Sequence, residues 1–183
     1  ICGPRGIGIF YSKNAPETFL RGGGQEKGIR SGTENVYGAL AFSRCLEKYY
    51  ISSQNKKMEE RFSEQKKYCG EFIRGLTQLE CCSIIPKSRP EKMDLYSPWI
   101  VQASFKNIPG QVLLRALDAE GFYISTGSAC SSRKNNRPVL KAMHVTQDES
   151  ETAVRFSFGS ETTENAMKEL LAKVREIAGK FNS

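Results

Sequence analysis

The feature that most constrains the fold is a long amphipathic helical pattern that occurs twice, separated by short apolar runs. Apolar residues recur at helical spacing over 58–76 and again over 162–181, with charged residues between them. Between these helices, apolar runs predict strands at 81–85, 99–105 and 153–159. Because strands and helices mix without strict βαβ alternation, the sequence predicts an α+β fold.

Weaker patterns predict the remaining elements. They are a strand over 7–12, a loop rich in glycine and charge over 13–33, helices over 34–50, 110–120 and 137–143, and a brief strand over 122–125. Thr162 or Thr163 is expected to cap the last helix.

Composition and charge narrow the function classes. The 183 residues include 27 Lys and Arg against 20 Asp and Glu, for a net charge of +7, and 39% of the residues are hydrophobic. The basic residues are scattered among acids, which argues against nucleic-acid binding. No run approaches the roughly 20 apolar residues of a membrane span, and the amino end lacks the layout of a signal peptide. We therefore expect a cytoplasmic protein that binds neither nucleic acid nor membrane.

The cysteine and histidine content argues against a metal site. The six cysteines contain no C-x-x-C pair and no repeated spacing that would indicate a disulfide framework or a zinc cage. His144 is the single histidine of the sequence, which excludes a His-rich metal site. We expect no metal and a reducing compartment.

Three positions are candidates for chemistry on sequence grounds. The segment 21–33 is glycine-rich and precedes a predicted helix, so it can hold a phosphate, although a flexible loop with a helix cap is the better explanation of a glycine-rich stretch taken alone. Cys130 lies among small and polar residues with Arg133 and Lys134 nearby, which favours a reactive thiolate. Arg155 lies on the polar face of its predicted strand, where its guanidinium could bind a carboxylate or simply be exposed.

Ordered motifs along the whole chain resemble one family. The motifs are Gly3-Pro4-Arg5-Gly6-Ile7-Gly8, Gly22-Gly23-Gly24-Gln25-Glu26, Arg30-Ser31-Gly32-Thr33-Glu34-Asn35, Ser125-Thr126-Gly127-Ser128-Ala129-Cys130-Ser131-Ser132, Val139-Leu140-Lys141-Ala142-Met143, and Arg155-Phe156-Ser157-Phe158-Gly159. In order and spacing they resemble the C-terminal half of the NifS/IscS-type cysteine desulfurases, which belong to the class V aminotransferase group of pyridoxal-phosphate enzymes.

The resemblance implies a role for each candidate residue. Cys130 matches the cysteine that attacks the substrate sulfur and becomes a persulfide, and Arg155 matches the arginine that holds the cysteine carboxylate. Thr33 matches the threonine that reaches the phosphate of pyridoxal 5'-phosphate bound to the neighbouring subunit of a homodimer. Two departures are Gln111, where Glu is common, and His144, where Gly often follows Ala-Met.

The resemblance also implies that the chain is incomplete. The lysine that holds the cofactor in the family directly precedes the position of Ile1, and the residues that contact the cofactor ring lie further upstream. A start inside a turn and an apolar run fits the back part of a longer protein. We expect residues 1–50 to be the end of the large cofactor-binding domain and the start of a helical link, and residues 51–183 to be the small C-terminal domain. The chain alone is expected to be inactive and to bind no covalent cofactor.

The implied reaction converts L-cysteine to L-alanine and passes the sulfur, through the enzyme persulfide, to a sulfur-acceptor scaffold protein for iron–sulfur cluster or thionucleoside synthesis. Two alternatives remain open at this stage. One is a selenocysteine lyase on the same frame, and the other is a non-catalytic module for dimerisation and sulfur-acceptor docking.

Overall fold

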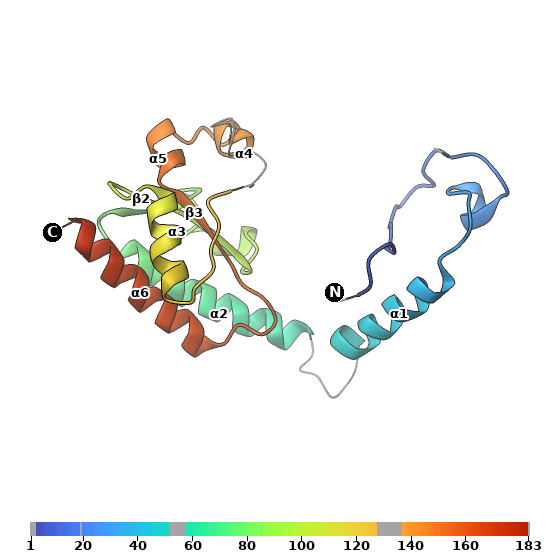
Figure 1. The fold of residues 1–183 in the computed structure, drawn as a ribbon, viewed down its shortest axis with the longest axis horizontal. Helices are drawn as coiled ribbons and strands as arrows, with labels where there is room; N and C mark the ends of the chain where they lie inside the picture. Colours follow the sequence, from blue (N-terminus) through green and yellow to red (C-terminus); the bar gives the residue numbers. More distant parts are fainter. Residues whose placement is uncertain (1–2, 19, 52–57, 128–136, 183) are drawn as a thin grey trace. The chain divides into compact units, whose positions relative to one another are not determined.

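The computed structural model describes residues 3–18, 20–51, 58–127 and 137–182, and the chain forms two compact units. The first unit spans Ile1–Glu60 and the second spans Arg61–Ser183. The second unit holds the sheet and the main hydrophobic core (Figure 1).

The sheet of the second unit has three antiparallel strands in the order β1-β2-β3. The strands are β1 (Cys82–Ile85), β2 (Ile100–Phe105) and β3 (Ala153–Ser157). In the register of β2 and β3, Gln102 lies opposite Arg155 and Ser104 lies opposite Ala153. All three strands form where the apolar runs predict them, and the mixture of helices with a small antiparallel sheet confirms the α+β class.

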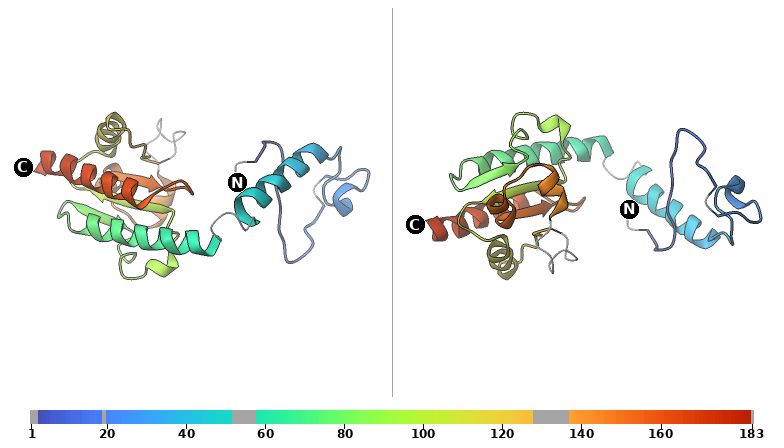
Figure 2. Two further views of the ribbon diagram at one scale, coloured as in Figure 1. Left: turned by 90° about the horizontal axis from the view of Figure 1, so that it is seen from below. Right: turned by 90° about the horizontal axis from the view of Figure 1, so that it is seen from above.

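Three helices carry the core on one face of the sheet. They are α2 (Met58–Thr77), α3 (Gly110–Ala119) and α6 (Glu164–Asn182). Figure 2 shows α2 and α6 lying side by side, and they approach closely because Gly75 of α2 has no Cβ to meet the side chain of Leu171. As expected, a threonine caps α6, since the Thr163 hydroxyl accepts a hydrogen bond from the Ala166 amide at 3.2 Å.

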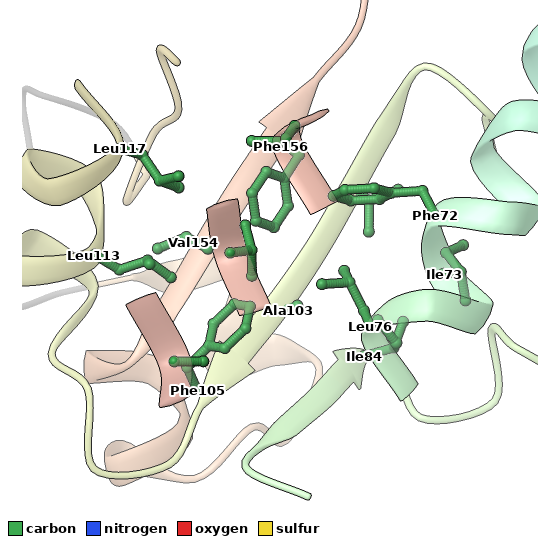
Figure 3. Packing of buried hydrophobic residues seen from close by; sticks show 14 of the residues in the cluster. Phe72, Ile73, Leu76, Ile84, Ala103, Phe105, Leu113, Leu117, Val154 and Phe156 are labelled. Carbon is green, nitrogen blue, oxygen red and sulfur yellow. The ribbon is translucent and has the colours of Figure 1, made fainter. Parts of the chain in front are cut away.

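The core consists of apolar side chains from the inner face of the sheet and from the three helices. Phe72 of α2 packs edge-on against Phe156 of β3, with ring centroids 5.2 Å apart. Figure 3 shows these rings together with Val154 of β3 and with Leu113 and Leu117 of α3, all of them buried. Alternation along β3 therefore leaves Arg155 on the opposite, polar face, as the sequence predicts.

A second, smaller cluster lies on the other face of the sheet. It joins the short helix α4 (Pro138–Ala142) to the strands through buried Ile85, Leu140 and Ala153, with Val145 packed against them. The short helix α5 (Gln147–Glu151) follows in the chain. Helix α5 was not predicted, although its capping box, Thr146 with Glu149, is legible in the sequence.

The first unit contains a 3-10 turn, η1 (Gln25–Gly28), the helix α1 (Val36–Leu46) and a π-helical segment, η2 (Glu47–Ile51). The predicted strand at 7–12 is wrong, because these residues pair with no other described segment. The predicted helix over 34–50 forms as α1 and η2, but its apolar residues Val36 and Leu40 are 64% and 59% exposed. The apolar pattern is present in this unit, but the described residues supply no sheet or second helix to cover it.

Two further observations complete the fold. The predicted strand at 122–125 is reduced to a single bridge between Ser125 and Arg155. Within the described ranges, no helix is both long and apolar enough to cross a membrane.

Candidate functional site

Arg155 stands between two neighbouring segments on the polar face of the sheet. Gln102 of β2 lies opposite it on one side, and Ser125 bridges to it on the other. The Arg155 amide donates to the Ser125 carbonyl at 2.5 Å, and the Ser125 amide donates to the Arg155 carbonyl at 3.1 Å. The backbone of Arg155 is thus fixed from both sides while its side chain is exposed.

A cavity of about 240 Å³ opens beside Arg155. Its described lining comes from β2, β3, the 126–127 corner and the start of α4. The lining residues are Gln102, Thr126, Gly127, Arg137, Pro138, Val139, Leu140 and Arg155. The lining combines an apolar part, Pro138, Val139 and Leu140, with the Arg155 guanidinium and the Gln102 and Thr126 side chains, while the Arg137 guanidinium is bonded to backbone carbonyls. Such a lining suits a small molecule that carries a carboxylate.

The corner at 125–127 is held by local hydrogen bonds. The Ser125 hydroxyl donates to the Gly127 carbonyl at 2.9 Å and accepts from the Gly127 amide at 3.1 Å. The Gln111 side chain donates to the Thr126 hydroxyl at 2.9 Å. Gln111, the residue that departs from the family pattern, therefore supports the corner that lines the cavity.

Cys130 lies outside the residues that the structure describes. Other cysteines can be compared with it. Burial raises the pKa of the Cys69 thiol, with Arg89 opposing the shift, and burial raises the pKa of Cys82 to about 12. These two thiols are therefore expected to stay protonated and to pack as small hydrophobic residues.

The glycine-rich segment of the first unit has an unusual backbone. Gly24, Gly28 and Gly32 have φ values of 79°, 77° and 127°. Glu26 and Lys27 are also left-handed, at 50° and 57°, which is uncommon for residues with a side chain. Left-handed non-glycine residues concentrate at functional sites, so this geometry favours a binding loop over a plain connector.

The same loop offers donors suited to a phosphate. A cavity of about 630 Å³ is lined by Glu17, Thr18, Arg21, Gly22, Gly28 and Ser31. The Ser31 hydroxyl is buried and has no hydrogen-bond partner within the described segments. Thr33 is exposed, and its hydroxyl likewise makes no hydrogen bond to described residues. Within this cavity the buried Ser31 hydroxyl and the Arg21 guanidinium suit a phosphate group, whereas the Glu17 carboxylate disfavours one, and Thr33 is not among the described residues that line it.

The predicted site residues therefore fall in different parts of the chain. Arg155 lies in the second unit and Thr33 in the first. Sequence reasoning missed Arg137, Gln102 and Thr126 as cavity residues. Gln102 could have been predicted, because alternation along β2 puts it on the same face of the sheet as Arg155. The sequence around Arg137 predicts only the start of a helix.

The sequence model for the family described as aminotransferase class-V matches residues 1–170. The chain belongs to this family. The match covers the first unit, most of the second and every candidate residue, Thr33, Cys130 and Arg155.

Individual relatives of this class-V chain carry more specific names. The NifS/IcsS protein homolog of Lactobacillus delbrueckii subsp. bulgaricus is 32% identical over 183 residues, covering 98% of this chain and 45% of that protein. The cysteine desulfurase IscS of Clostridium botulinum is 32% identical over 181 residues, covering 96% of this chain and 43% of that protein. This chain thus spans less than half the length of these curated relatives.

A solved structure agrees in fold. A NifS-like protein matches with a TM-score of 0.71 and 31% sequence identity, over 97% of this chain and 43% of that chain. The class-V assignment therefore rests on sequence and fold together.

Proposed function

We propose that this chain is the C-terminal part of a pyridoxal-phosphate-dependent cysteine desulfurase, which converts L-cysteine to L-alanine and carries the sulfur as a persulfide. The observation that carries the proposal is Arg155, fixed by backbone bonds at a small cavity in a chain whose relatives are named cysteine desulfurases. The cavity volume of about 240 Å³ suits a substrate the size of an amino acid.

Arg155 is proposed to bind the carboxylate of cysteine. Its guanidinium can donate two parallel hydrogen bonds to the two carboxylate oxygens, which fixes orientation as well as charge. Gln102 and Thr126 line the same cavity and offer neutral donors and acceptors. The substrate is therefore proposed to bind on the polar face of the sheet.

Cys130 is proposed to accept the sulfur. Its thiolate attacks the substrate sulfur, a new S–S bond forms, the substrate C–S bond breaks, and the departing carbon takes a proton to become the methyl group of alanine. Cys130 follows Gly127 of the cavity lining by three residues, and three residues of chain span at most roughly 11 Å. The connection between cavity and thiol is therefore short.

Pyridoxal phosphate, when bound, supplies an electron sink for the substrate. Thr33 is proposed to donate its hydroxyl to the cofactor phosphate of the neighbouring subunit in a homodimer. The orphaned Ser31 hydroxyl and the left-handed backbone around it support a phosphate subsite in this loop. The remaining cofactor contacts are proposed to come from sequence upstream, so that residues 1–183 alone are inactive.

The wider setting is also part of the proposal. Residues 1–50 are assigned to the end of the large domain and the start of the link, and residues 51–183 to the small domain. The sulfur acceptor is a scaffold protein, and the reaction takes place in the cytoplasm.

Formation of L-alanine from L-cysteine tests the function. The complete protein, of which residues 1–183 form the C-terminal part, should release alanine with cofactor present, and Cys130→Ala should abolish alanine release. Cys81→Ala is the matched control, since Cys81 is a partly exposed thiol that lines a different cavity. Alanine released only from L-selenocysteine would favour a selenocysteine lyase, and no turnover of either substrate would favour a docking module.

A further inference from the structure

One wall of the Arg155 cavity is a short helix with few anchors. Helix α4 has five residues, and its first three, Pro138, Val139 and Leu140, line the cavity. A helix of this length has no independent stability in water. Leu140 holds it to the sheet by inserting into the small cluster with Ile85 and Ala153.

Arg137, immediately before α4, provides a second anchor. Its Nη1 donates to the carbonyl of Ala153 at 3.1 Å and to the carbonyl of Ser150. Ala153 is the first residue of β3 and Ser150 belongs to α5, so one guanidinium joins the start of α4 to two other elements. Burial lowers the pKa of Arg137, and the carboxylate of Glu151 opposes the shift.

Few other groups near the Ala153 carbonyl could replace the Arg137 guanidinium as its hydrogen-bond donor. A Cβ on Gly110 would lie 2.8 Å from the Ala153 carbonyl oxygen, so the backbone of α3 closes in on that carbonyl from another side. The Nε of Arg137 lies 3.9 Å from the position of a Cβ on Gly127. Arg137 is therefore packed beside the 125–127 corner and bonded to β3 two residues before Arg155.

We propose that Arg137 is a positioning residue that fixes the α4 wall and the corner around Arg155, and so sets the room available to the molecule that Arg155 binds. This inference rests on the proposed function, because the role of Arg155 in carboxylate binding comes from there. Arg137 acts through its carbonyl partners and need not touch the substrate.

The first test uses residues 1–183 without cofactor or substrate. Arg137→Met keeps an apolar stem of similar length but removes both hydrogen bonds. Amide hydrogen exchange of Ser125 and Arg155, whose amides bond to each other's carbonyls, should then accelerate by about tenfold. The Lys106 amide, bonded to the Cys81 carbonyl, is the internal control and should keep its exchange rate.

The second test uses the complete protein with L-cysteine. Arg137→Met should raise KM by roughly 3- to 30-fold while changing kcat by less than about threefold. Arg137→Lys should recover part of the affinity, because an ammonium can still donate to both carbonyls. If the Met variant does not fold, the Lys variant carries both measurements alone.

A matched arginine separates positioning from general stability. Arg175 of α6 also donates to a carbonyl, that of Gly75 at 3.3 Å, and to Gln78 Oε1 at 2.6 Å, but it lines a different cavity. Arg175→Met should lower the melting temperature and leave KM and the Ser125 and Arg155 exchange rates unchanged.

The outcomes distinguish the two levels of the account. If Arg155→Ala raises KM but Arg137→Met leaves either KM or the two exchange rates unchanged, the positioning role is overturned and the proposed function stands. If Arg155→Ala itself leaves KM unchanged, the proposed function fails, and the positioning role fails with it.

Discussion

At the scale of single residues, the Arg155 guanidinium is the group whose removal should weaken cysteine binding most specifically. Arg155→Ala in the complete protein removes a charge-assisted bidentate contact of about 2 to 4 kcal/mol, which corresponds to roughly 30- to 1000-fold weaker cysteine binding. Arg155→Lys should rescue poorly, because an ammonium cannot reproduce the planar fork. Titration of cysteine into the cofactor-loaded protein gives the affinity, and an unchanged value would make Arg155 a surface arginine.

His144 carries backbone strain that a substitution can release. It has φ 56° at the end of α4, where the His144 amide donates to Lys141 and the Val145 amide donates to Leu140. This is the Schellman arrangement, in which glycine is preferred at the left-handed position. His144→Gly should therefore raise the free energy of unfolding by about 0.5 to 1 kcal/mol, as measured by urea denaturation.

The control for this substitution is Lys141→Gly, an exposed position inside α4. There glycine should lower the free energy of unfolding by about 1 kcal/mol. Equal losses from both substitutions would show that the backbone at residue 144 is not strained. The sequence identified His144 as a departure from the family pattern, and the structure gives its physical meaning as a left-handed cap.

At the scale of elements, the capping box of α5 makes stability depend on pH. The hydrogen bond from Lys87 holds the pKa of Glu149 below its usual value of 4.5, and Thr146 adds to the shift against a desolvation penalty. A lowered carboxyl pKa stabilises the folded state above pH 4.5, and that stabilisation is lost as the pH falls through the lowered value.

Glu149→Gln should therefore reduce stability by about 0.5 kcal/mol at pH 7, a small effect because the pair is solvent-screened. The difference from the unmodified chain should shrink as the pH falls from 4.5 through the lowered pKa of Glu149, below which residue 149 is neutral in both proteins. Thermal unfolding across this range measures it. A difference that stays constant with pH would mean that the carboxylate charge contributes nothing.

Several elements that sequence reasoning found also bury the face that their apolar periodicity marks, whereas the predicted helix over 34–50 forms as α1 and η2 but leaves Val36 and Leu40 exposed. Helices α2 and α6 and strand β3 bury one face each, so their apolar spacing was sufficient. Residues 7–12 have the apolar character of a strand but no partner in the described part of the chain. A strand requires a neighbour for its backbone bonds, and local sequence does not report one.

The site residues likewise divide into those that the local sequence predicts and those that it does not. Arg155 could be predicted because alternation along a strand fixes the face on which it lies. Arg137 could not, because its role depends on two carbonyl groups brought to it by α5 and β3. Hydrogen bonds between segments that meet only in the folded protein produce no periodic pattern in the sequence.

At the scale of the whole molecule, the chain is a class-V aminotransferase segment that spans less than half of the curated relatives it matches. Its second unit contributes the Arg155 cavity and its first unit contributes the glycine-rich loop with Thr33. The proposed cysteine desulfurase would use both contributions together with a thiol that accepts sulfur. The proposed assignment of that thiol to Cys130 is the central claim.

Mass spectrometry of the complete protein after brief exposure to L-cysteine tests this claim most directly. The account predicts one added sulfur atom on the proteolytic peptide that contains Cys130, removed by a reducing agent and absent from Cys130→Ala. The peptide that contains Cys69 should be unmodified, because burial keeps this thiol protonated. Sulfur found on another cysteine, or a Cys130 peptide of unchanged mass in a protein that still forms alanine, would contradict the account.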